Sequence, residues 1–522
     1  MNVTFTIIKD NYIGSGGTIM KGISLWKSIS SRPSDYPHLN SDIEVDVAII
    51  GGGITGVTAA MELSKAGKKV AVIESGQMGG ATTSMSTGNL YVQTQPSYQR
   101  IASAFDLNTA KQVAHSRQMA IDYIEKNVRA LEIPCHFSRR PWYGYSDAQK
   151  ESYFSKEIET LKEMGLDVEY ISSLPLELKF KKAAVLQNQA RFNPLQYVLS
   201  MAAELAKQGC LIYENTHVID IKENKDDCVI RSKSGRITAQ KLFMATHSPL
   251  GFNKTQMFIA PYSSYVVAAY INRDEYPEGQ FWGFTDNSFI LSTHSVKEAK
   301  PEILLVAGSH HKTGQSQNMQ GHIAEIEKYL HENFSVSEVA FRWSAQHFQA
   351  ADKLPYIGLA SHSSKHSYMA TGFFADGLTY GTLAGILVAD HILNNSNPFF
   401  EIYQSNRSNL MSSIGFISKE NLNVMAQYAK DLPLAEETDF SSLPMGEGRV
   451  VEINREKCAV SRDSSNKLHI VSAVCTHMKC IVKWNNAEQT WDCPCHGSRF
   501  KPSGEVIEGP AMIDLENKEI KS

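Results

Sequence analysis

The stretch VDVAIIGGGITG at residues 45–56 decides the fold of this 522-residue chain. Apart from Asp46, its first six residues are apolar, which is typical of a strand buried in a parallel sheet. Residues 55–66 then have the apolar spacing of a helix, which Gly67 can end. Residues 69–74 (KVAVIE) have the pattern of a second buried strand. Together these segments predict a βαβ unit and therefore an α/β fold.

The glycines of this unit predict a dinucleotide site. Gly51 permits the tight turn after the strand, Gly53 lets a pyrophosphate approach the backbone, and Gly56 lets helix and strand pack closely. The N-terminus of the helix then faces the phosphates. Glu74 ends the next strand about twenty residues on, where a carboxylate accepts hydrogen bonds from a ribose. A purely structural glycine turn is the alternative, but it does not explain the strand, the helix and the acid together.

The fingerprint alone does not distinguish FAD from NAD, but three other features favour FAD. One such fingerprint is visible, near the beginning of the chain. Residues 79–90 (GGATTSMSTGNL) form a loop of small and hydroxyl-bearing residues that is suited to lie along a flavin. Far along the chain, residues 352–358 (DKLPYIG) precede 371–379 (TGFFADGLT), a second glycine loop at the start of a helix. Such a loop can return to the ribityl and phosphate groups.

The rest of the sequence predicts helices and strands around a β-rich middle. Helices are expected near 98–130, 151–165, 191–209 and 377–393, and strands at 210–213, 218–223, 228–232, 241–245, 259–271, within 288–308, and at 354–358 and 368–371. A polar, partly acidic segment with one predicted helix at 419–430 follows. Beyond it, short strand patterns separated by turns predict a small all-β domain.

Four of the eight cysteines cluster within 21 residues of this last part, in the segments CTHMKC (475–480) and CPCHGS (493–498). Two short loops that each offer one cysteine and one histidine suit a binuclear iron cluster of the Rieske type. One iron takes two thiolates and the other takes two imidazoles, so the expected ligands are Cys475, His477, Cys493 and His496. The alternative is a tetrahedral zinc site, because a bare set of two Cys and two His can equally bind Zn²⁺. The surrounding CPCHGS pattern favours the cluster.

The flanks of these loops resemble Rieske proteins. By this resemblance, the remaining pair, Cys480 and Cys495, ties the loops together with a disulfide, and Ser498 donates a hydrogen bond to a cluster sulfur. Phe500 stands where high-potential members carry a tyrosine, and the loss of that hydroxyl donor implies a lower potential. The other cysteines, at 135, 210, 228 and 458, are dispersed and are expected to be core residues.

The whole chain after about residue 25 resembles the D-amino-acid oxidase/glycine oxidase superfamily of flavoproteins, and most closely its bacterial members that are fused to a Rieske domain. The residues that carry the resemblance are GGGITG, VAVIE, the Thr/Ser loop near 82–87, WSAQ, DKLPYIG, ATGFFADGLTYG and the two cysteine–histidine segments. The resemblance implies an α/β Rossmann-type FAD-binding domain with an inserted β-rich substrate domain (α+β), plus a small all-β Rieske domain.

This resemblance also implies domain limits and cofactor contacts. The expected parts are a leader (1–41), an FAD-dependent oxidoreductase (42–412), a connector (413–440) and a Rieske [2Fe-2S] domain (441–522). Within the oxidoreductase, residues 42–95, 191–250 and 343–396 would bind FAD, and 96–190 and 251–342 would form the substrate domain. The implied FAD contacts are Gly51, Gly53, Gly56, Glu74, Thr82, Thr83, Ser86, Thr87, Val218, Gly372, Gly377, Leu378 and Thr379.

The implied activity is removal of a hydride from a carbon that bears an amine or hydroxyl group, in an amine, an amino acid or a hydroxy acid. Electrons would pass from FAD through the cluster to an external one-electron acceptor, a protein or a quinone, with His477 and His496 at the exit. No acid–base residue is required by flavin chemistry. Weak candidates for substrate contact are Trp343, Gln346, His347, Tyr356, His310 and His311.

Two other enzyme classes compete with this interpretation. A Rieske oxygenase component needs a mononuclear iron held by two histidines and a carboxylate, for which no convincing set is visible. An NAD(P)H-dependent reductase that feeds electrons to the cluster needs a second nucleotide fingerprint. A non-enzymatic redox sensor is a third, weaker alternative.

The composition restricts the class of protein, its partners and its location in the cell. Apolar residues make up 42% and charged residues 20% of the chain, as in ordinary globular proteins. The net charge of −4 gives no reason to expect a nucleic acid or an anionic membrane as partner. The sequence shows neither a membrane span nor a secretory signal, so we expect a cytoplasmic protein.

Overall fold

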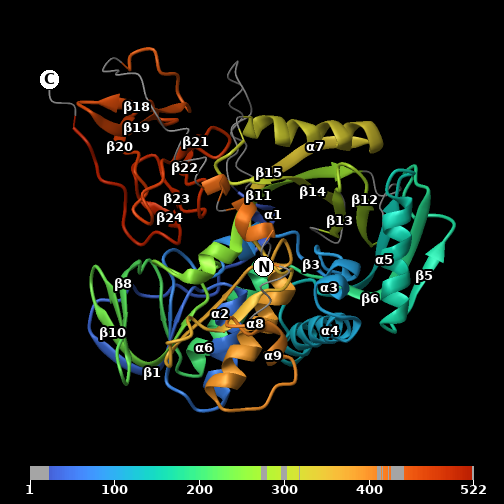
Figure 1. Cartoon of the computed structure of the whole chain (residues 1–522), viewed down its shortest axis with the longest axis horizontal. Coiled ribbons are helices and arrows are strands. Elements are labelled where there is room, and N and C mark those ends of the chain that lie inside the picture. Colours follow the sequence, from blue (N-terminus) through green and yellow to red (C-terminus); the bar gives the residue numbers. More distant parts are fainter. Residues whose placement is uncertain are drawn as a thin grey trace, which may run out of the picture.

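The computed structural model describes residues 23–271, 279–295, 302–316, 318–407, 413, 415–420, 422–424 and 440–519. These residues form two large sheets with their helices and two small sheets near the C-terminus (Figure 1). The two large sheets build the oxidoreductase part, and the small sheets form a separate lobe against it (Figure 1). The expected fold class is confirmed.

The first large sheet has eight strands, in the order β16-β17-β10-β1-β2-β7, with the β8–β9 hairpin attached to β10. The strands are β1 (Ile43–Ile50), β2 (Val70–Ile73), β7 (Leu211–Tyr213), β8 (Val218–Glu223), β9 (Cys228–Ser232), β10 (Arg236–Met244), β16 (Tyr356–Leu359) and β17 (Ser367–Thr371). Strand β1 is parallel to β2 and to β10. Its inner residues are buried, as the continuous apolar run predicts.

Helices α2 (Ile54–Lys65), α6 (Pro194–Lys207) and α8 (Gly377–Ile392) belong to this sheet, and α9 (Phe400–Tyr403) follows α8. The α2–α8 pair packs closely because small residues line the contact. A Cβ atom on Gly385 would lie 2.7 Å from the Thr55 carbonyl oxygen and 2.9 Å from the Ala59 nitrogen. This close contact holds the start of α8 beside the glycine loop at the start of α2, although the two are far apart in sequence.

The second large sheet has nine strands, in the order β15-β11-β14-β13-β12-β4-β6-β3, with β5 attached to β6. They are β3 (Asn89–Leu90), β4 (Ser138–Ser146), β5 (Val168–Ile171), β6 (Lys182–Arg191), β11 (Ile259–Ile271), β12 (Gln280–Phe284), β13 (Ile290–Ser295), β14 (Glu302–Lys312) and β15 (Val336–Ala350). Its helices are α3 (Tyr98–Ala104), α4 (Leu107–Ala130), α5 (Glu151–Glu163) and α7 (Met319–Asn333).

The expected division of the oxidoreductase at residue 343 falls inside strand β15. That strand pairs with β11 along its length, from Val336 opposite Ile271 to Ala350 opposite Ile259. Residues 343–350 therefore pair within the second sheet.

The C-terminal lobe contains a three-stranded sheet, β18-β19-β20, and a four-stranded sheet, β21-β22-β23-β24. Their strands are β18 (Gly448–Ile453), β19 (Glu456–Arg462), β20 (Leu468–Ser472), β21 (Lys483–Asn485), β22 (Thr490–Asp492), β23 (Arg499–Phe500) and β24 (Val506–Glu508). All pairings in both sheets are antiparallel. One cysteine–histidine loop follows β20 and the other follows β22.

Residues 23–41 run along the oxidoreductase part as an extension of it. Helix α1 (Leu25–Ile29) buries Trp26, whose indole Nε1 donates to the Ser86 carbonyl at 2.7 Å. Two 3₁₀ turns, η1 (Thr82–Met85) and η2 (Lys254–Phe258), complete the elements. The helix predicted at 419–430 lies mostly outside the described residues, although 419, 420 and 422–424 are helical.

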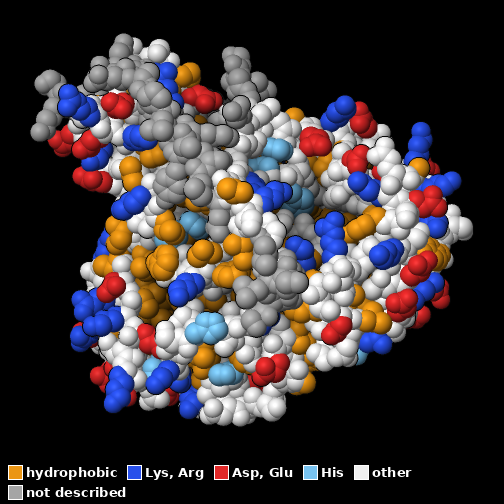
Figure 2. Space-filling model, viewed as in Figure 1, with side chains coloured by type: hydrophobic (Ala, Val, Ile, Leu, Met, Phe, Trp, Pro, Cys, Tyr) orange, Lys and Arg blue, Asp and Glu red, His pale blue; other side chains and the backbone are white. Residues whose placement is uncertain are grey.

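The surface and the helices agree with the composition. Figure 2 shows acidic and basic side chains interspersed over the face that it presents, in keeping with the net charge of −4. Within the part of the chain that the structure describes, no helix combines the length and the apolar character that crossing a membrane requires.

Candidate active site and cluster site

One large cavity lies where the first sheet, the second sheet and the C-terminal lobe meet. It encloses about 1860 Å³ of space between the atoms when its open mouth is included. The wall begins at the glycine loop of β1 and α2 and continues past β8 to the start of α8. Residues from β11, β14, β15 and the loop around β24 complete it. The walls of the cavity therefore come from all three parts of the molecule.

The glycine loop has the backbone that a dinucleotide site needs. Gly51 has a φ of +109°, which favours glycine, and a Cβ atom there would lie 2.5 Å from the Ala245 carbonyl oxygen. A Cβ atom on Gly56 would lie 1.9 Å from the Gly51 carbonyl oxygen. Gly53 is the N-cap of α2 and lines the cavity with the first residues of the helix, so the positive end of the helix dipole faces it. The loop therefore fits the phosphates of FAD.

Glu74 is buried at the end of β2 and lines the same cavity. Its carboxylate accepts hydrogen bonds from the Gly52 and Gly76 amides, each at 2.8 Å. Burial raises the pKa of Glu74, and these amides act in the opposite direction. The Glu74 side chain thus supports the glycine loop through its hydrogen bond with Gly52. It also faces the cavity at the position expected for a ribose.

The structure brings most of the proposed FAD contacts into one wall. Those in it are Gly51, Gly53, Glu74, Thr82, Thr83, Ser86, Thr87, Val218, Gly377, Leu378 and Thr379. Gly56 and Gly372 lie behind the wall, because Gly56 packs against the Gly51 backbone and Gly372 against Ala350. Their contribution is close packing rather than a surface for the cofactor.

Asp376 and Arg117 are site residues that the sequence did not reveal. Asp376 precedes α8, lines the cavity and is 5% exposed. One of its oxygens accepts from the Thr94 hydroxyl and the Gln95 amide, each at 3.0 Å. Arg117 is fully buried behind it, 3.6 Å away, and donates to carbonyls of residues 91, 92 and 93. The charged ADG segment at 375–377 was the available signal for Asp376; Arg117 stands in an ordinary amphipathic helix.

The six candidates for substrate contact divide into two groups. His310, Gln346 and His347 line the cavity. Trp343 lies outside its wall, with its indole donating to the Met85 carbonyl at 2.7 Å, so it supports the 82–87 loop. Tyr356 packs under the Arg407 guanidinium, and His311 packs against the rings of His322 and Tyr265. Trp343, Tyr356 and His311 thus lie outside the wall, because strand alternation and packing turn their side chains elsewhere.

Three histidines of the wall, His247, His310 and His347, are enclosed. Burial lowers the pKa of His310 and of His247 to about 4, and it lowers the pKa of His347 well below its usual range. Both ring nitrogens of His347 and the Nδ1 atom of His310 are buried without a hydrogen-bond partner among the described residues. Buried polar atoms of this kind are normally paired, so this end of the cavity is built for a polar ligand.

The two cysteine–histidine loops meet in the C-terminal lobe. The imidazoles of His477 and His496 lie with their centroids 5.1 Å apart. The Nδ1 atoms of both are buried without a hydrogen-bond partner among the described residues, and burial lowers the pKa of both rings to about 4. A hydrogen bond with Cys493 lowers the pKa of Cys475, so the two sulfurs are neighbours. Two adjacent thiols and two neutral imidazoles with free Nδ1 atoms fit a Rieske cluster.

Cys480 and Cys495 are joined by a disulfide with a Cα–Cα distance of 6.6 Å, the pairing that the resemblance to Rieske proteins implies. The sulfurs of Cys480, Cys493 and Cys495 lie within 4.8 Å of one another, so the bridge lies directly against a ligand. The Ser498 hydroxyl accepts a hydrogen bond from the Ala511 amide at 3.0 Å and also lowers the pKa of Cys475. This contact ties the second loop to the segment after β24.

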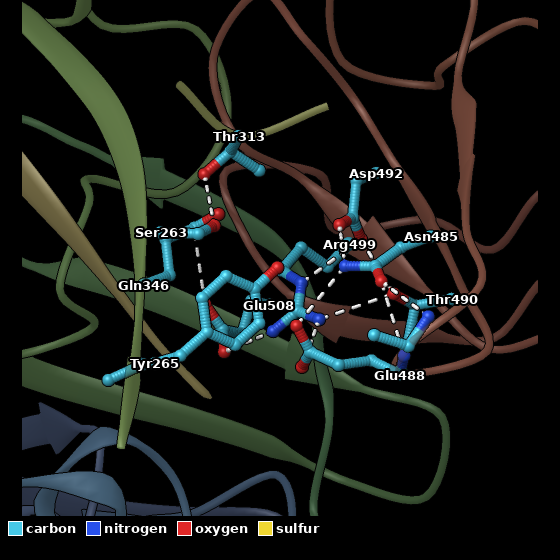
Figure 3. Close-up of polar contacts among 12 residues, drawn as sticks. Ser263, Tyr265, Thr313, Gln346, Asn485, Glu488, Thr490, Asp492, Arg499 and Glu508 are labelled. Atoms are coloured by element: carbon cyan, nitrogen blue, oxygen red, sulfur yellow. Dashed lines mark hydrogen bonds and ion pairs between the residues drawn. The ribbon is translucent and has the colours of Figure 1, made fainter. Parts of the chain in front are cut away.

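A polar network connects the cluster lobe to the second large sheet (Figure 3). The Arg499 guanidinium contacts three carboxylates, those of Asp492 at 3.0 Å, Glu488 at 2.6 Å and Glu508 at 3.5 Å. On the other side, the Gln346 amide donates to the Glu508 carboxylate at 3.0 Å and to the Gly497 carbonyl at 2.9 Å. Gln346 and Glu508 both line the large cavity.

The imidazole edge of His477, which is partly exposed, contacts the oxidoreductase part. Its Nε2 atom is 3.1 Å from the Gln256 side-chain oxygen. The amide of Gln256 in turn donates to the Pro249 and Gly251 carbonyls, at 2.9 and 2.7 Å. The Gly251 amide donates to the Pro510 carbonyl at 2.9 Å. These contacts join the first cysteine–histidine loop to the segment that follows β10.

Comparison with known proteins agrees with this geometry. The model of the FAD dependent oxidoreductase family (DAO) matches residues 46–391, and the Rieske [2Fe-2S] domain matches residues 433–518. Over 495 residues the chain is 34% identical to YhfW of Bacillus subtilis (strain 168), described as a Rieske 2Fe-2S iron-sulfur protein, covering 94% of this chain and 96% of that protein. Gamma-glutamylputrescine oxidoreductase of Escherichia coli (strain K12) is 20% identical over 396 residues, covering 72% of this chain and 90% of that protein.

Solved structures show the same fold for the oxidoreductase part. Glycine oxidase from Geobacillus kaustophilus superposes with a TM-score of 0.59 at 19% identity, covering 70% of this chain and 99% of that one. L-proline dehydrogenase from P. horikoshii superposes with a TM-score of 0.58 at 18% identity, covering 70% of this chain and 98% of that one.

Proposed function

We propose, for a chain that belongs to the family of FAD-dependent oxidoreductases and carries a C-terminal Rieske [2Fe-2S] domain, that it oxidises a small amine, amino acid or hydroxy acid and delivers the electrons through the cluster to an external acceptor. FAD supplies a two-electron acceptor and the cluster a one-electron carrier. The substrate loses two electrons and two protons and becomes an imine or a carbonyl compound. The acceptor, a protein or a quinone, takes the electrons one at a time.

One observation carries this proposal: the two cofactor sites share a wall. Residues 506–509 and 511 of the Rieske domain line the same cavity as the glycine loop at 51–53. A Rieske domain that served only as an independent carrier would not need to close the cavity of the flavin. The shared wall supports electron transfer within the chain.

The docking of His477 gives this transfer a direction. Gln256 and Gly251 belong to the segment between β10 and β11, and Leu250 of the same segment lines the cavity. A cluster ligand that contacts this segment lies on the side where electrons arrive. We therefore propose His477 as the side facing the flavin, which leaves His496 or another face of the lobe for the external acceptor.

The proposed function is tested by replacing one cluster ligand, His496→Cys. Substrate added without oxygen is expected to bleach the flavin of this variant at the rate of the unaltered protein, because the cavity is unchanged. Reduction of a one-electron acceptor should be lost, and the EPR signal of the reduced cluster should change. His362→Cys, at an exposed position in the loop before β17, is the matched control.

Continued reduction of the acceptor by the His496→Cys variant would exclude the relay. Two further measurements separate the competing classes. Two irons per chain fit the present proposal, whereas three would indicate an oxygenase component. Anaerobic bleaching of the flavin by NADH would indicate an NAD(P)H-dependent reductase.

A further inference from the structure

The charged side chains in the wall of the cavity are all acidic. Among the described residues that line it there is neither an arginine nor a lysine, whereas Glu74, Asp376 and Glu508 are acidic. Glu74 lies at the ribose end, and Asp376 is paired with Arg117. Glu508 is the remaining acid, and it comes from the Rieske domain.

The charge of Glu508 is only partly balanced. Arg499 is its cationic neighbour, but this guanidinium also contacts Asp492 and Glu488 at shorter distances. One cation is thus shared by three carboxylates, and Glu508 is the most distant of them. Although enclosed by the two domains, the side chain keeps 21% of its surface accessible, and Glu508 forms part of the cavity wall.

The neutral groups beside Glu508 also call for a hydrogen-bond donor. The Gln346 amide nitrogen is used by Gly497 and Glu508, which leaves the Gln346 side-chain oxygen as an acceptor without a partner among the described residues. The neighbouring His347 and the nearby His310 have unpaired ring nitrogens. Because burial lowers the pKa of both imidazoles, neither supplies a positive charge at neutral pH.

A substrate carboxylate would find no cationic partner among the described residues of this wall. Burial of a carboxylate without a cation costs several kcal/mol, and it would also be repelled by Glu508. An ammonium or amine group has the opposite properties, since it donates hydrogen bonds and carries the charge that Glu508 lacks.

We propose that the substrate is an amine without a carboxylate group, and that Glu508 of the Rieske domain determines this specificity by facing the amine across the cavity. This inference rests on the proposed function and narrows its substrate class. It also gives the domain fusion a second purpose, because the Rieske domain then contributes to the substrate site as well as to electron transfer.

The test compares matched pairs that differ by a carboxylate: 2-phenylethylamine with phenylalanine, dimethylamine with sarcosine, and 2-phenylethanol with phenyllactate. Each compound is added to the full-length protein without oxygen, and flavin absorbance and the EPR signal of the cluster are recorded on the same sample. The amines are expected to bleach the flavin, and the carboxylates and the alcohol are not.

A binding measurement complements this comparison. tert-Butylamine has no hydrogen on the carbon that bears nitrogen, so it can bind without being oxidised, and its binding is followed by the change in the flavin spectrum. Glu508→Gln should weaken this binding at least tenfold. Glu505→Gln should leave it unchanged, because this exposed carboxylate lies immediately before β24 and pairs with Lys501. An unaltered EPR signal confirms that the variant keeps its cluster.

The outcomes separate this inference from the proposed function. The inference is overturned if an amino acid bleaches the flavin as fast as its amine partner does, even where the cluster is then reduced. It is also overturned if the hydroxy acid bleaches the flavin as fast as the amines do. Failure of every amine to bind or to bleach the flavin also overturns it, as does unchanged binding by Glu508→Gln. Bleaching by amines while the cluster stays oxidised supports the inference and contradicts the relay.

Discussion

Single atoms decide the geometry of the glycine loop. Gly51 and Gly56 face each other through one carbonyl oxygen, and neither position has room for a Cβ atom. The same loop is held from the side by the Glu74 carboxylate through the Gly52 amide. The loop is therefore rigid before FAD binds, which lowers the entropic cost of binding.

Gly56→Ala should abolish or strongly reduce FAD retention. A Cβ atom 1.9 Å from the Gly51 carbonyl oxygen forces the loop and α2 apart, and overpacking of this kind costs about 1–3 kcal/mol or more. FAD content per chain and the melting temperature are the measurements. Gly165→Ala is the control, since it has a positive φ but nothing within 4 Å of the added atom; it should lose about 1 kcal/mol and keep its FAD. Equal FAD content in the two variants would show that the contact is not needed.

The buried histidines of the cavity predict loss of stability in acid. His247 and His310 have pKa values of about 4, below the ordinary value of 6.5. Below pH 6.5 the unfolded chain binds these protons and the folded chain does not, so stability falls as the pH decreases from 6.5 towards 4. Each histidine contributes on the order of 3 kcal/mol to this loss. Glu74, whose pKa is raised by burial, acts in the opposite direction.

His310→Asn should therefore flatten the decline of the melting temperature between about pH 6.5 and pH 4. His362→Asn, at an exposed position, is the control and should follow the unaltered protein. An identical decline in all three proteins would mean that His310 is protonated in the folded state.

At the scale of secondary-structure elements, the two ligand loops depend on the disulfide that joins them. Each loop follows a short strand, β20 or β22, and neither strand is long enough to orient a loop of six residues by itself. The disulfide between Cys480 and Cys495 joins the loops where the cluster would lie between them.

Replacing both bridging cysteines, Cys480→Ser with Cys495→Ser, should destabilise the Rieske domain by about 3 kcal/mol, the value for a closed loop of about fifteen residues. Iron content per chain and the EPR signal should fall, while FAD content should not, because the flavin wall is built mainly from the other domain. Cys228→Ser, at a buried cysteine beside Ser367, is the control and should keep its iron. Full iron content in the double variant would contradict a role for the bridge.

For the whole molecule, the placement of one domain on the other matters most. Contacts between them include His477 with Gln256, Gln346 with Gly497 and Glu508, and Gln315 with Pro494. These contacts hold the cluster loops over the mouth of the cavity. The distance from flavin to cluster therefore depends on the side chains at this contact between the domains.

Gln256→Met should slow reduction of the cluster by the flavin without slowing reduction of the flavin by substrate. Loss of a hydrogen bond worth about 1 kcal/mol reduces the docked population about fivefold. Freeze-quenched EPR samples and flavin absorbance follow the two steps. Gln315→Met removes another contact between the domains, 3.1 Å from the Pro494 carbonyl, and serves as control because it does not touch a cluster ligand. Equal rates in the two variants would contradict a special role for the His477 contact.

Local chemistry is what the sequence by itself determined about this protein. The βαβ unit, the glycine fingerprint and the two cysteine–histidine segments each lie within a few tens of residues, and their spacing follows from turn geometry and from ligand reach. The class of fold and the two cofactors could therefore be predicted. The disulfide followed from a resemblance, since spacing alone does not pair cysteines.

Only the tertiary structure decided which distant groups share one cavity. It placed Asp376 in the wall with Arg117 behind it, removed Trp343, Tyr356 and His311 from the wall, and turned His477 towards Gln256. It also brought Glu508 beside Gln346, from a position 162 residues away in the sequence. Contacts of this range depend on how whole sheets and domains pack, and no local pattern of residues encodes them.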